Sequence, residues 1–357
     1  MTDTGHMTHA LCLAARGLGS VWPNPAVGCV IVQGGRVVGR GVTQPGGRPH
    51  AERVALAQAG DAARGATVYV TLEPCAHHGQ TSPCAKALIS AGVARVVTGM
   101  TDPDPRVAGR GHALLRAAGI AVTEGVCADQ AQAVAAGFVK RVTQGLPFVT
   151  LKLASSFDGR TALADGSSRW ITGAGARRAV HAMRLRHDAV LVGAGTAVAD
   201  DPDLTVRGMG AVRPPVRVVM DRGLRTSPAG RLGHTARDVP VWMLHATGAV
   251  AGDWAGTGAT LIAAGGLTAR EGLQALATRG ITRVFCEGGA TLAASLLAAD
   301  LVDEVVMFTA GIAIGGAGFA AVGVLPPVPL AETNRFTLKS TFQTGVDAVT
   351  IWARNPA

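Results

Sequence analysis

The chain is poor in aromatic side chains, in apolar runs and in blocks of one charge. Aromatic residues make up only 4% of its 357 residues, so it offers few rings on which nucleic-acid bases could stack. No apolar run reaches the ~20 residues that a membrane-spanning helix needs. The N-terminus does not show a charged start followed by a long apolar core, the pattern of a secretory signal. We therefore expect a cytoplasmic protein that binds neither nucleic acid nor membrane.

Cysteine is also scarce, with six residues scattered along the chain. This scatter in a long chain argues against a disulfide framework. The formal net charge is +9, but both halves share the basic excess and no basic run is present. A phosphorylated small substrate fits this charge as well as a nucleic acid does. Among the cysteines, only Cys75 and Cys84 are close enough in sequence to suggest a shared metal ion.

What the chain has in abundance is an alternation of short apolar runs and helical stretches. Its length allows two domains, and the stretch 142–148 reads as a linker or turn. We predict two α/β domains, residues 1–145 and 146–357, each with helices on the faces of a sheet. The predicted helices cover 51–60, 84–93, 111–120, 175–187, 269–280 and 291–301. The predicted strands cover 26–32, 36–42, 66–72, 94–100, 121–126, 148–154, 188–196, 216–221, 239–245, 260–265, 282–289 and 303–310.

The first candidate site combines a histidine, a glutamate and two cysteines. "PHAE" places His50 and Glu52 at the start of a predicted helix, and "TLEPCAHHGQTSPC" contains Cys75 and Cys84. One imidazole and two thiolates give Zn²⁺ three ligands and leave the fourth tetrahedral position for water, as in catalytic zinc sites. Zinc lowers the pKa of its water towards 7. Glu52 could then move protons between that water and a leaving amine.

This pattern resembles the signature of the zinc nucleobase deaminases, H-x-E followed by P-C-x-x-C. The spacing differs, because the second cysteine here follows the first after a longer stretch. H-x-E alone could occur by chance near two buried cysteines, but its occurrence together with "TLEPCAHHGQTSPC" makes chance improbable. His77 and His78 are a rival pair of ligands, which we interpret as loop residues near the substrate or as a hydrogen-bonded structural pair.

The second domain has no G-x-G-x-x-G after its first strand. Its glycine-rich candidates are "GAGTAVADDP" and "CEGGATLAASL". In the latter a strand ends in Glu287-Gly288-Gly289 and a helix begins near Thr291, and a helix N-terminus behind glycines can bind phosphate. Arg184 and Arg207 suit bidentate phosphate contacts, although solvated surface charges are the simpler interpretation. Trp170 is either a core residue or a flat wall for a ring.

Five stretches resemble the RibD family of bifunctional riboflavin biosynthesis proteins: "PNPAVGCVIV", "PHAE", "VTLEPCAHHGQTSPC", "LKLASSFDGRTALADGSSRWITG" and "ADDPDLTVR". The long cysteine spacing is that family's form of the zinc motif. The resemblance covers nearly the whole chain and implies a cytidine-deaminase-like three-layer domain followed by a dihydrofolate-reductase-like domain. It implies zinc-dependent deamination of a diaminopyrimidinone ribosyl phosphate, then NADPH-dependent reduction of the ribosyl to the ribityl side chain. It also implies self-association.

The resemblance implies roles for individual residues. In the first domain, zinc would be held by His50, Cys75 and Cys84, protons moved by Glu52, and the pyrimidine hydrogen-bonded by Asn24. In the second, the cofactor positions are Ala154, Trp170, Thr196, Asp200, Gly289, Ala290, Thr291 and Leu292, with Arg222 where many relatives carry serine. The substrate positions are Ser168, Arg184, Leu204, Arg207 and Glu287, the two arginines being expected on the phosphate. Lys152 and Asp200 are the candidates for proton supply.

The second half also departs from the family. Residues 308–318, "FTAGIAIGGAG", lack the usual Pro-x-Leu-Leu-Gly run, and the loop between Arg207 and Arg217 is short. Two other functions are considered. One is a nucleic-acid deaminase acting on tRNA adenosine, and the other is a non-enzymatic, metal-stabilised binding protein with a decayed reductase.

Overall fold

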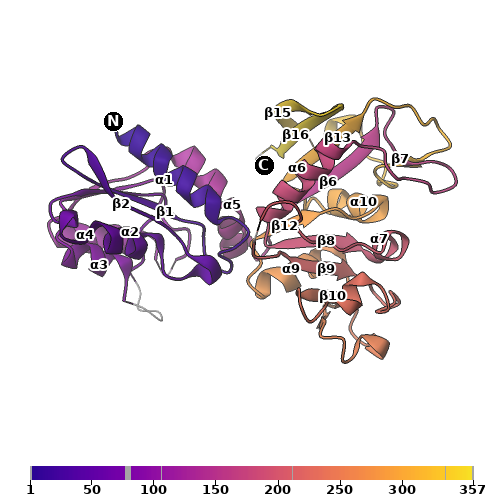
Figure 1. Cartoon of the computed structure of the whole chain (residues 1–357), viewed down its shortest axis with the longest axis horizontal. Coiled ribbons are helices and arrows are strands. Elements are labelled where there is room, and N and C mark those ends of the chain that lie inside the picture. Colours follow the sequence, from indigo (N-terminus) through magenta and orange to yellow (C-terminus); the bar gives the residue numbers. More distant parts are fainter. Residues whose placement is uncertain (1, 77–81, 106, 211, 334, 356–357) are drawn as a thin grey trace. The chain divides into compact units, whose positions relative to one another are not determined.

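The computed structural model describes residues 2–76, 82–105, 107–210, 212–333 and 335–355. The chain divides into two compact units, Met1–Leu146 and Pro147–Ala357 (Figure 1). Neither unit contains, within these described ranges, a helix long and apolar enough to cross a bilayer.

The first unit is built on a five-stranded sheet in the order β2-β1-β3-β4-β5. β1 runs antiparallel to both of its neighbours, whereas β3, β4 and β5 are parallel. The strands are β1 (Gly28–Gln33), β2 (Arg36–Val42), β3 (Thr67–Val70), β4 (Arg95–Thr98) and β5 (Ala121–Thr123). The β1–β2 hairpin turns at Gly34 and Gly35, which both have positive φ, a conformation that glycine adopts without steric cost. The predicted hairpin is confirmed.

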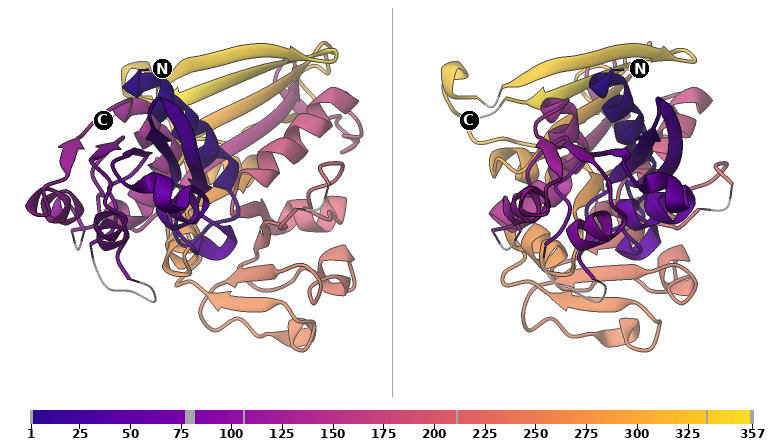
Figure 2. Two further views of the ribbon diagram at one scale, coloured as in Figure 1. Left: turned by 60° about the vertical axis from the view of Figure 1, so that its left-hand side comes forward. Right: turned by 90° about the vertical axis from the view of Figure 1, so that its left-hand side faces the viewer.

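Helices cover both faces of this sheet (Figures 1 and 2). The helices are α1 (Asp3–Gly17), α2 (Ala51–Ala59), α3 (Cys84–Ser90), α4 (Arg110–Ala117) and α5 (Ala128–Gln144). Apolar residues of α2, α3 and α4 pack with Cys29, Ile31 and Val68 on one face. Residues of α1 and α5 pack with Val30 and Tyr69 on the other. Period-2 alternation along the strands thus separates two cores and gives three layers.

The second unit contains a nine-stranded sheet in the order β11-β10-β9-β8-β12-β6-β13-β16-β15. The first seven of these strands are parallel, and β13, β16 and β15 form an antiparallel edge. The strands are β6 (Phe148–Ser156), β8 (Ala189–Gly193), β9 (Val216–Met220), β10 (Val241–His245), β11 (Thr260–Ala263), β12 (Arg283–Cys286), β13 (Glu304–Ala310), β15 (Phe336–Thr344) and β16 (Asp347–Arg354). A separate small ladder pairs β7 (Arg160–Ala162) with β14 (Phe319–Ala320).

Helices also lie on both faces of the second sheet. α6 and α8 pack with inward residues such as Val190 and Phe308. α9 lies on the opposite face, where a Cβ on Gly272 would meet the side chains of Met220 and Leu244. The helices are α6 (Ala174–Leu185), α7 (Ala194–Asp200), α8 (Arg231–His234), α9 (Ala269–Thr278) and α10 (Ala290–Ala298). Short 3₁₀ turns are η1 (Pro45–Gly47), η2 (Gly60–Ala63), η3 (Gly252–Trp254) and η4 (Leu330–Glu332).

Two expectations about elements were wrong. The linker expected over 142–148 begins later, because α5 continues to Gln144 and ends at Gly145, whose φ is 66° and whose N–H donates to Arg141 O. The strand expected over 188–196 ends at Gly193, where α7 begins. Its "GAGTAVAD" segment has the small residues of a tight strand-to-helix turn, which the apolar pattern does not separate from a strand.

Candidate active sites

The first site lies where α2 and α3 begin beside the end of β3. His50 is the N-cap of α2, and Glu52 lies in the first turn of that helix. Cys84 is the first residue of α3 and follows Pro83, while Cys75 lies in the loop after β3. Within the described part of the chain, His50, Cys75 and Cys84 are the one group of ligand-type side chains close enough to hold a metal ion.

The three ligand atoms have the spacing of a tetrahedral zinc site. His50 Nδ1 lies 3.8 Å from Cys75 Sγ and 3.4 Å from Cys84 Sγ. Zinc bonds to sulfur and nitrogen in a tetrahedron would place such atoms about 3.6 Å apart. The donor set also fits the metal chemically, since one imidazole and two sulfurs are typical of zinc. The residues present therefore suit Zn²⁺ without rearrangement.

Hydrogen bonding and burial shift the pKa values of side chains in this site. Hydrogen bonding with the Cys84 thiol and with His50 lowers the pKa of Cys75 to about 4, and Cys84 N–H donates to Cys75 Sγ over 3.3 Å. A thiolate is the form that binds metal. Glu52 is only 4% exposed, and this burial raises its pKa above the ordinary value of a glutamate, which favours a role in proton transfer.

A small cavity of about 150 Å³ opens beside the cluster. His50, Glu52 and Cys75 line it, and so does Asn24, whose Nδ2 donates to Gly47 O over 3.0 Å. The structure thus brings the predicted pyrimidine residue to the wall that Glu52 faces. The other polar residues of the wall are Thr43, Arg48, Glu73, Asp102, Asp104 and Arg141. His77 and His78 lie outside the described residues.

Glu73 is a residue of this site that sequence reasoning missed. Its buried carboxylate accepts hydrogen bonds from four backbone N–H groups: Asp102 (3.1 Å), Gly109 (2.9 Å), Gly111 (2.8 Å) and His112 (3.3 Å). Two of these donors belong to the start of α4, where negative charge is favourable. Glu73 therefore fastens the loop that carries Cys75 to the loop that follows β4. The only signal in the sequence was its place in "TLEPC".

The second site is a larger cavity of about 530 Å³ in the second unit. It lies at the carboxyl ends of the parallel strands β6, β8 and β12, where open α/β sheets bind their ligands. The lining includes ten predicted residues: Lys152, Ala154, Ser168, Trp170, Arg184, Thr196, Asp200, Leu204, Arg207 and Glu287. It does not include Arg222, Gly289, Ala290, Thr291 or Leu292, although a Cβ on Gly289 would lie 3.1 Å from Thr196 Oγ1. For those five the cofactor role stays a prediction.

Arg184 and Glu287, both predicted to contact substrate, are partners of each other. Arg184 Nε and Nη2 lie 2.5 and 3.1 Å from the two carboxylate oxygens of Glu287. Arg184 Nη1 also donates to Thr205 O over 2.7 Å. With these contacts and 9% exposure, Arg184 is part of the scaffold of the wall. Of the two arginines expected on the phosphate, Arg207 is the accessible one, with a side chain 64% exposed.

Lys152 and Trp170 both line the second cavity. Burial lowers the pKa of Lys152, against the opposing effect of Glu287. Trp170 is 70% exposed, so the core interpretation of this residue was wrong. The guanidinium carbon of Arg177 lies 4.6 Å from the centre of its ring, which is a cation–π distance.

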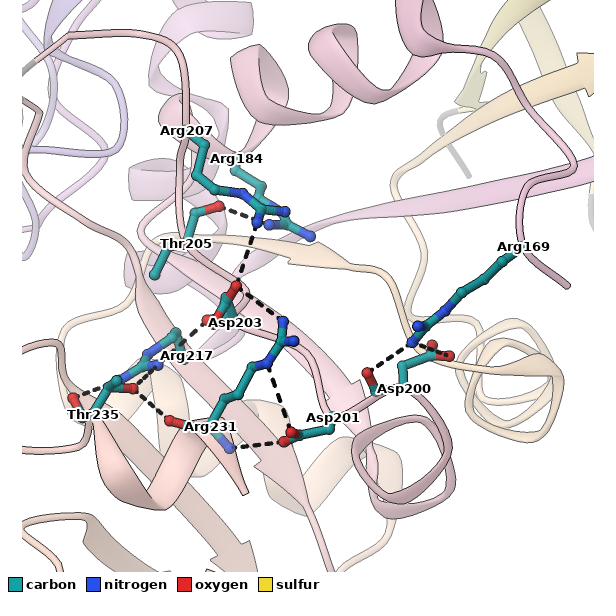
Figure 3. Close-up of polar contacts among 10 residues, drawn as sticks. All are labelled: Arg169, Arg184, Asp200, Asp201, Asp203, Thr205, Arg207, Arg217, Arg231 and Thr235. Atoms are coloured by element: carbon teal, nitrogen blue, oxygen red, sulfur yellow. Dashed lines mark hydrogen bonds and ion pairs between the residues drawn. The ribbon is translucent and has the colours of Figure 1, made fainter. Parts of the chain in front are cut away.

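Several charged residues of the second cavity were missed. They come from separate segments. Figure 3 shows four of them, Arg169, Asp201, Asp203 and Arg231, around the end of α7 and the loop that follows it. Asp201 and Asp203 stand in the quoted "ADDPDLTVR" but carried no assigned role. Arg231 lies in a stretch without a periodic pattern, so nothing in the sequence pointed to it. The missed ionisable residues are Arg169, Arg177, His181, Asp201, Asp203 and Arg231.

Comparisons with known proteins agree with this geometry. Residues 1–100 match the cytidine and deoxycytidylate deaminase zinc-binding region, and residues 147–350 match the RibD C-terminal domain. The riboflavin biosynthesis protein RibD of Haemophilus influenzae is 42% identical over an alignment of 357 positions, which covers 97% of this chain and 95% of that protein. The Escherichia coli protein of the same name is 41% identical, with 97% of this chain and 98% of that protein covered. The chain belongs to the RibD family.

Solved RibD structures support the same conclusion. RibD of Acinetobacter baumannii superposes with a TM-score of 0.90 at 39% identity, covering 99% of both chains. The Thermotoga maritima diaminohydroxyphosphoribosylaminopyrimidine deaminase/5-amino-6-(5-phosphoribosylamino)uracil reductase gives 0.89 at 34% identity, again with 99% of both chains covered.

RibD membership confirms the predicted cytidine-deaminase-like and dihydrofolate-reductase-like domains. The chain is a bifunctional deaminase and reductase of riboflavin biosynthesis, with a zinc-binding deaminase domain and an NADPH-dependent reductase domain. The two other functions considered from the sequence do not fit relatives of this kind over nearly the full length.

Proposed function

We propose that residues 1–145 deaminate 2,5-diamino-6-(5-phosphoribosylamino)pyrimidin-4(3H)-one to 5-amino-6-(5-phosphoribosylamino)uracil. We further propose that residues 146–357 reduce the ribosyl side chain of that product to ribityl with NADPH. The observation that carries the proposal is the cluster of His50, Cys75 and Cys84 beside buried Glu52. The second unit holds a separate cavity that is lined by the half-buried Lys152. The substrates are phosphorylated pyrimidines, and we propose a homo-oligomer in the cytoplasm.

In the deamination, His50, Cys75 and Cys84 would hold the zinc ion. When bound, the metal supplies a water of lowered pKa as nucleophile. Glu52 lies at the same wall and moves the protons: its carboxylate accepts one from the water and returns it to the leaving amino group. Asn24 is held by Gly47 O, and its amide orients the pyrimidine ring.

In the reduction, the ribosylamine opens to an imine at C1′. When bound, NADPH supplies the hydride that adds to this carbon. A proton must then be delivered by the chain, and Lys152 and Asp200 are the proposed donors. Because burial lowers the pKa of Lys152, its ammonium group gives up a proton more readily than an exposed one would. Trp170 provides a wall, and the remaining cofactor and substrate positions, Arg222 and Gly289–Leu292 among them, keep their predicted roles.

The test follows NADPH oxidation by absorbance with purified protein. With the diaminopyrimidinone phosphate as substrate, we expect oxidation in the wild type and none in Glu52→Ala. Supplying the deaminated intermediate should restore oxidation in Glu52→Ala, which would assign the two steps to two sites in this order. A zinc-loaded protein that oxidises NADPH with neither substrate would refute the reductase assignment.

A further inference from the structure

The stretch from Asp201 to Arg207 forms a wall of the second cavity without regular secondary structure. Side chains of other elements hold its backbone in place of strand pairing. Arg184 on α6 donates to Thr205 O over 2.7 Å. The backbone N–H of Arg207 donates to His181 Nδ1 over 3.3 Å. The shape of this wall therefore depends on side-chain hydrogen bonds, which single substitutions can remove.

The deepest of these contacts comes from Arg217 on β9, whose side chain is fully buried. Its Nη1 donates to Asp203 O (3.3 Å) and to Thr235 Oγ1 (2.7 Å). Its Nη2 donates to Thr235 O (3.0 Å) and to Val239 O (2.6 Å). All four acceptors are neutral oxygens. Burying a guanidinium costs free energy, and here its contacts fix backbone positions, one of them in the cavity wall.

The Asp203 side chain points to two arginines at the cavity (Figure 3). Its Oδ2 lies 3.4 Å from Arg207 Nη1 and 3.5 Å from Arg231 Nη1. Asp201 also contacts Arg231: the backbone N–H of Arg231 donates to Asp201 Oδ1 over 2.8 Å. The side chains of Arg207 and Arg231 are 64% and 60% exposed. Each guanidinium has five N–H donors, and the acidic partners engage only part of them.

We propose that Arg217 and Asp203 are positioning residues that set Arg207 and Arg231 as a pair for the phosphate group of the reductase substrate. Arg217 fixes the carbonyl of Asp203, and the carboxylate of Asp203 orients both guanidinium groups. Two arginines held in this way can bind a phosphate dianion through several charge-assisted hydrogen bonds. Arg231 is then a phosphate-binding residue in addition to Arg207. This inference rests on the proposed function, because it takes its ligand from it.

The test compares Asp203→Asn, Arg231→Gln, Arg217→Lys and the double variant Asp203→Asn/Arg217→Lys. We expect each single variant to raise the KM for 5-amino-6-(5-phosphoribosylamino)uracil about tenfold, with the KM for NADPH within about twofold of wild type. The KM of the double variant should not exceed that of the single variant with the larger KM, because both changes act on one chain of contacts. Calorimetric titration with ribose 5-phosphate should show the same order of affinities without turnover.

Arg283→Lys serves as the matched control, since Arg283 starts β12 at the end away from the cavity. It should alter thermal stability but leave both KM values unchanged. Unchanged KM in Asp203→Asn and Arg231→Gln, an equal rise for NADPH, or additive effects in the double variant would overturn the inference. If Arg217→Lys does not fold, the first two variants still decide. A wild type that binds ribose 5-phosphate more tightly than Asp203→Asn does, but that does not turn over, would refute the proposed function and keep the positioning roles.

Discussion

Glu73 is a single carboxylate on which two loops of the zinc site depend. A glutamine there would lose the negative charge and turn its NH₂ group toward backbone donors. We expect Glu73→Gln to destabilise the first unit by about 3 kcal/mol and to speed zinc loss to a chelator about tenfold. Zinc release can be followed with a colorimetric chelator, and unfolding of the zinc-free protein by calorimetry. Asp61→Asn, at an exposed acid of the same unit, should change neither, and equal behaviour of the two variants would contradict the role of Glu73.

His187 makes the stability of the second unit depend on pH. Its Nδ1 donates to Met183 O (2.7 Å), so its Nε2 accepts from Thr150 Oγ1 (3.0 Å) in the neutral form. Burial lowers its pKa to about 3, against about 6.5 in an unfolded chain. Between these values the unfolded chain binds the extra proton. The free energy of unfolding should therefore fall as pH drops below about 6.5, by up to about 1.4 kcal/mol per pH unit.

Urea unfolding followed by tryptophan fluorescence, to which buried Trp254 of the second unit contributes, can measure this dependence. In His187→Gln the amide keeps both hydrogen-bond functions but does not titrate. Its unfolding midpoint should decline less steeply between pH 6 and pH 4. Parallel pH profiles for the two proteins would rule out His187 as the cause.

At the scale of elements, close contact between α2 and β2 places the deaminase residues. A Cβ on Gly41 would lie 1.9 Å from Ala51 O in the first turn of α2. Gly41→Ala should push this turn, with His50 and Glu52, away from the sheet at a cost of about 3 kcal/mol. We expect lower zinc content and slower deamination, with reduction of the deaminated intermediate unchanged. Gly311→Ala, which has no atom within 4 Å of its new Cβ, should leave deamination intact; if it impaired zinc binding equally, the steric argument would be wrong.

The predictability of elements depends on how regularly each one is buried. The hairpin of β1 and β2 and the helix over 51–60 were predicted because apolar period and glycine ends agree. The edge strand β15 was missed although Phe336, Leu338 and Phe342 alternate with polar residues. The strand is exposed at all but its two terminal residues, so this alternation does not mark a buried face. α1 was also missed, although Met7, Ala10, Leu11 and Ala14 follow a helical period. Its interspersed polar residues hid that signal.

The same contrast holds for the sites. His50, Cys75 and Cys84 lie within one short span with a chemically specific spacing, so the sequence was sufficient to propose them. Arg231 and Arg217 act through contacts between segments that only the folded chain brings together. An arginine on a strand such as β9 has the same sequence pattern whether its guanidinium is solvated or buried. Sequence reasoning could therefore name the chemistry of the cavity but not the residues that shape it.

At the scale of the whole molecule, zinc ligands lie in the first unit and the NADPH-dependent reductase domain is the second. Removal of zinc should therefore stop NADPH oxidation when the diaminopyrimidinone phosphate is supplied and leave it intact with the deaminated intermediate. The measurement is NADPH absorbance before and after dialysis against a strong chelator. Restoration by added Zn²⁺ is the control. Loss of both rates on chelation would mean that the second unit also needs the metal.

The place of β6 in its sheet has a consequence for how the chain is made. β6 is the first strand after the end of α5, yet it lies between β12 and β13, which come from residues 283–286 and 304–310. The ribosome therefore completes the whole first unit long before β12 and β13 are synthesised and can pair with β6. Distant pairings of this kind form slowly and leave strand edges open in the meantime. Newly synthesised chains should thus depend on chaperones chiefly during the second half of translation.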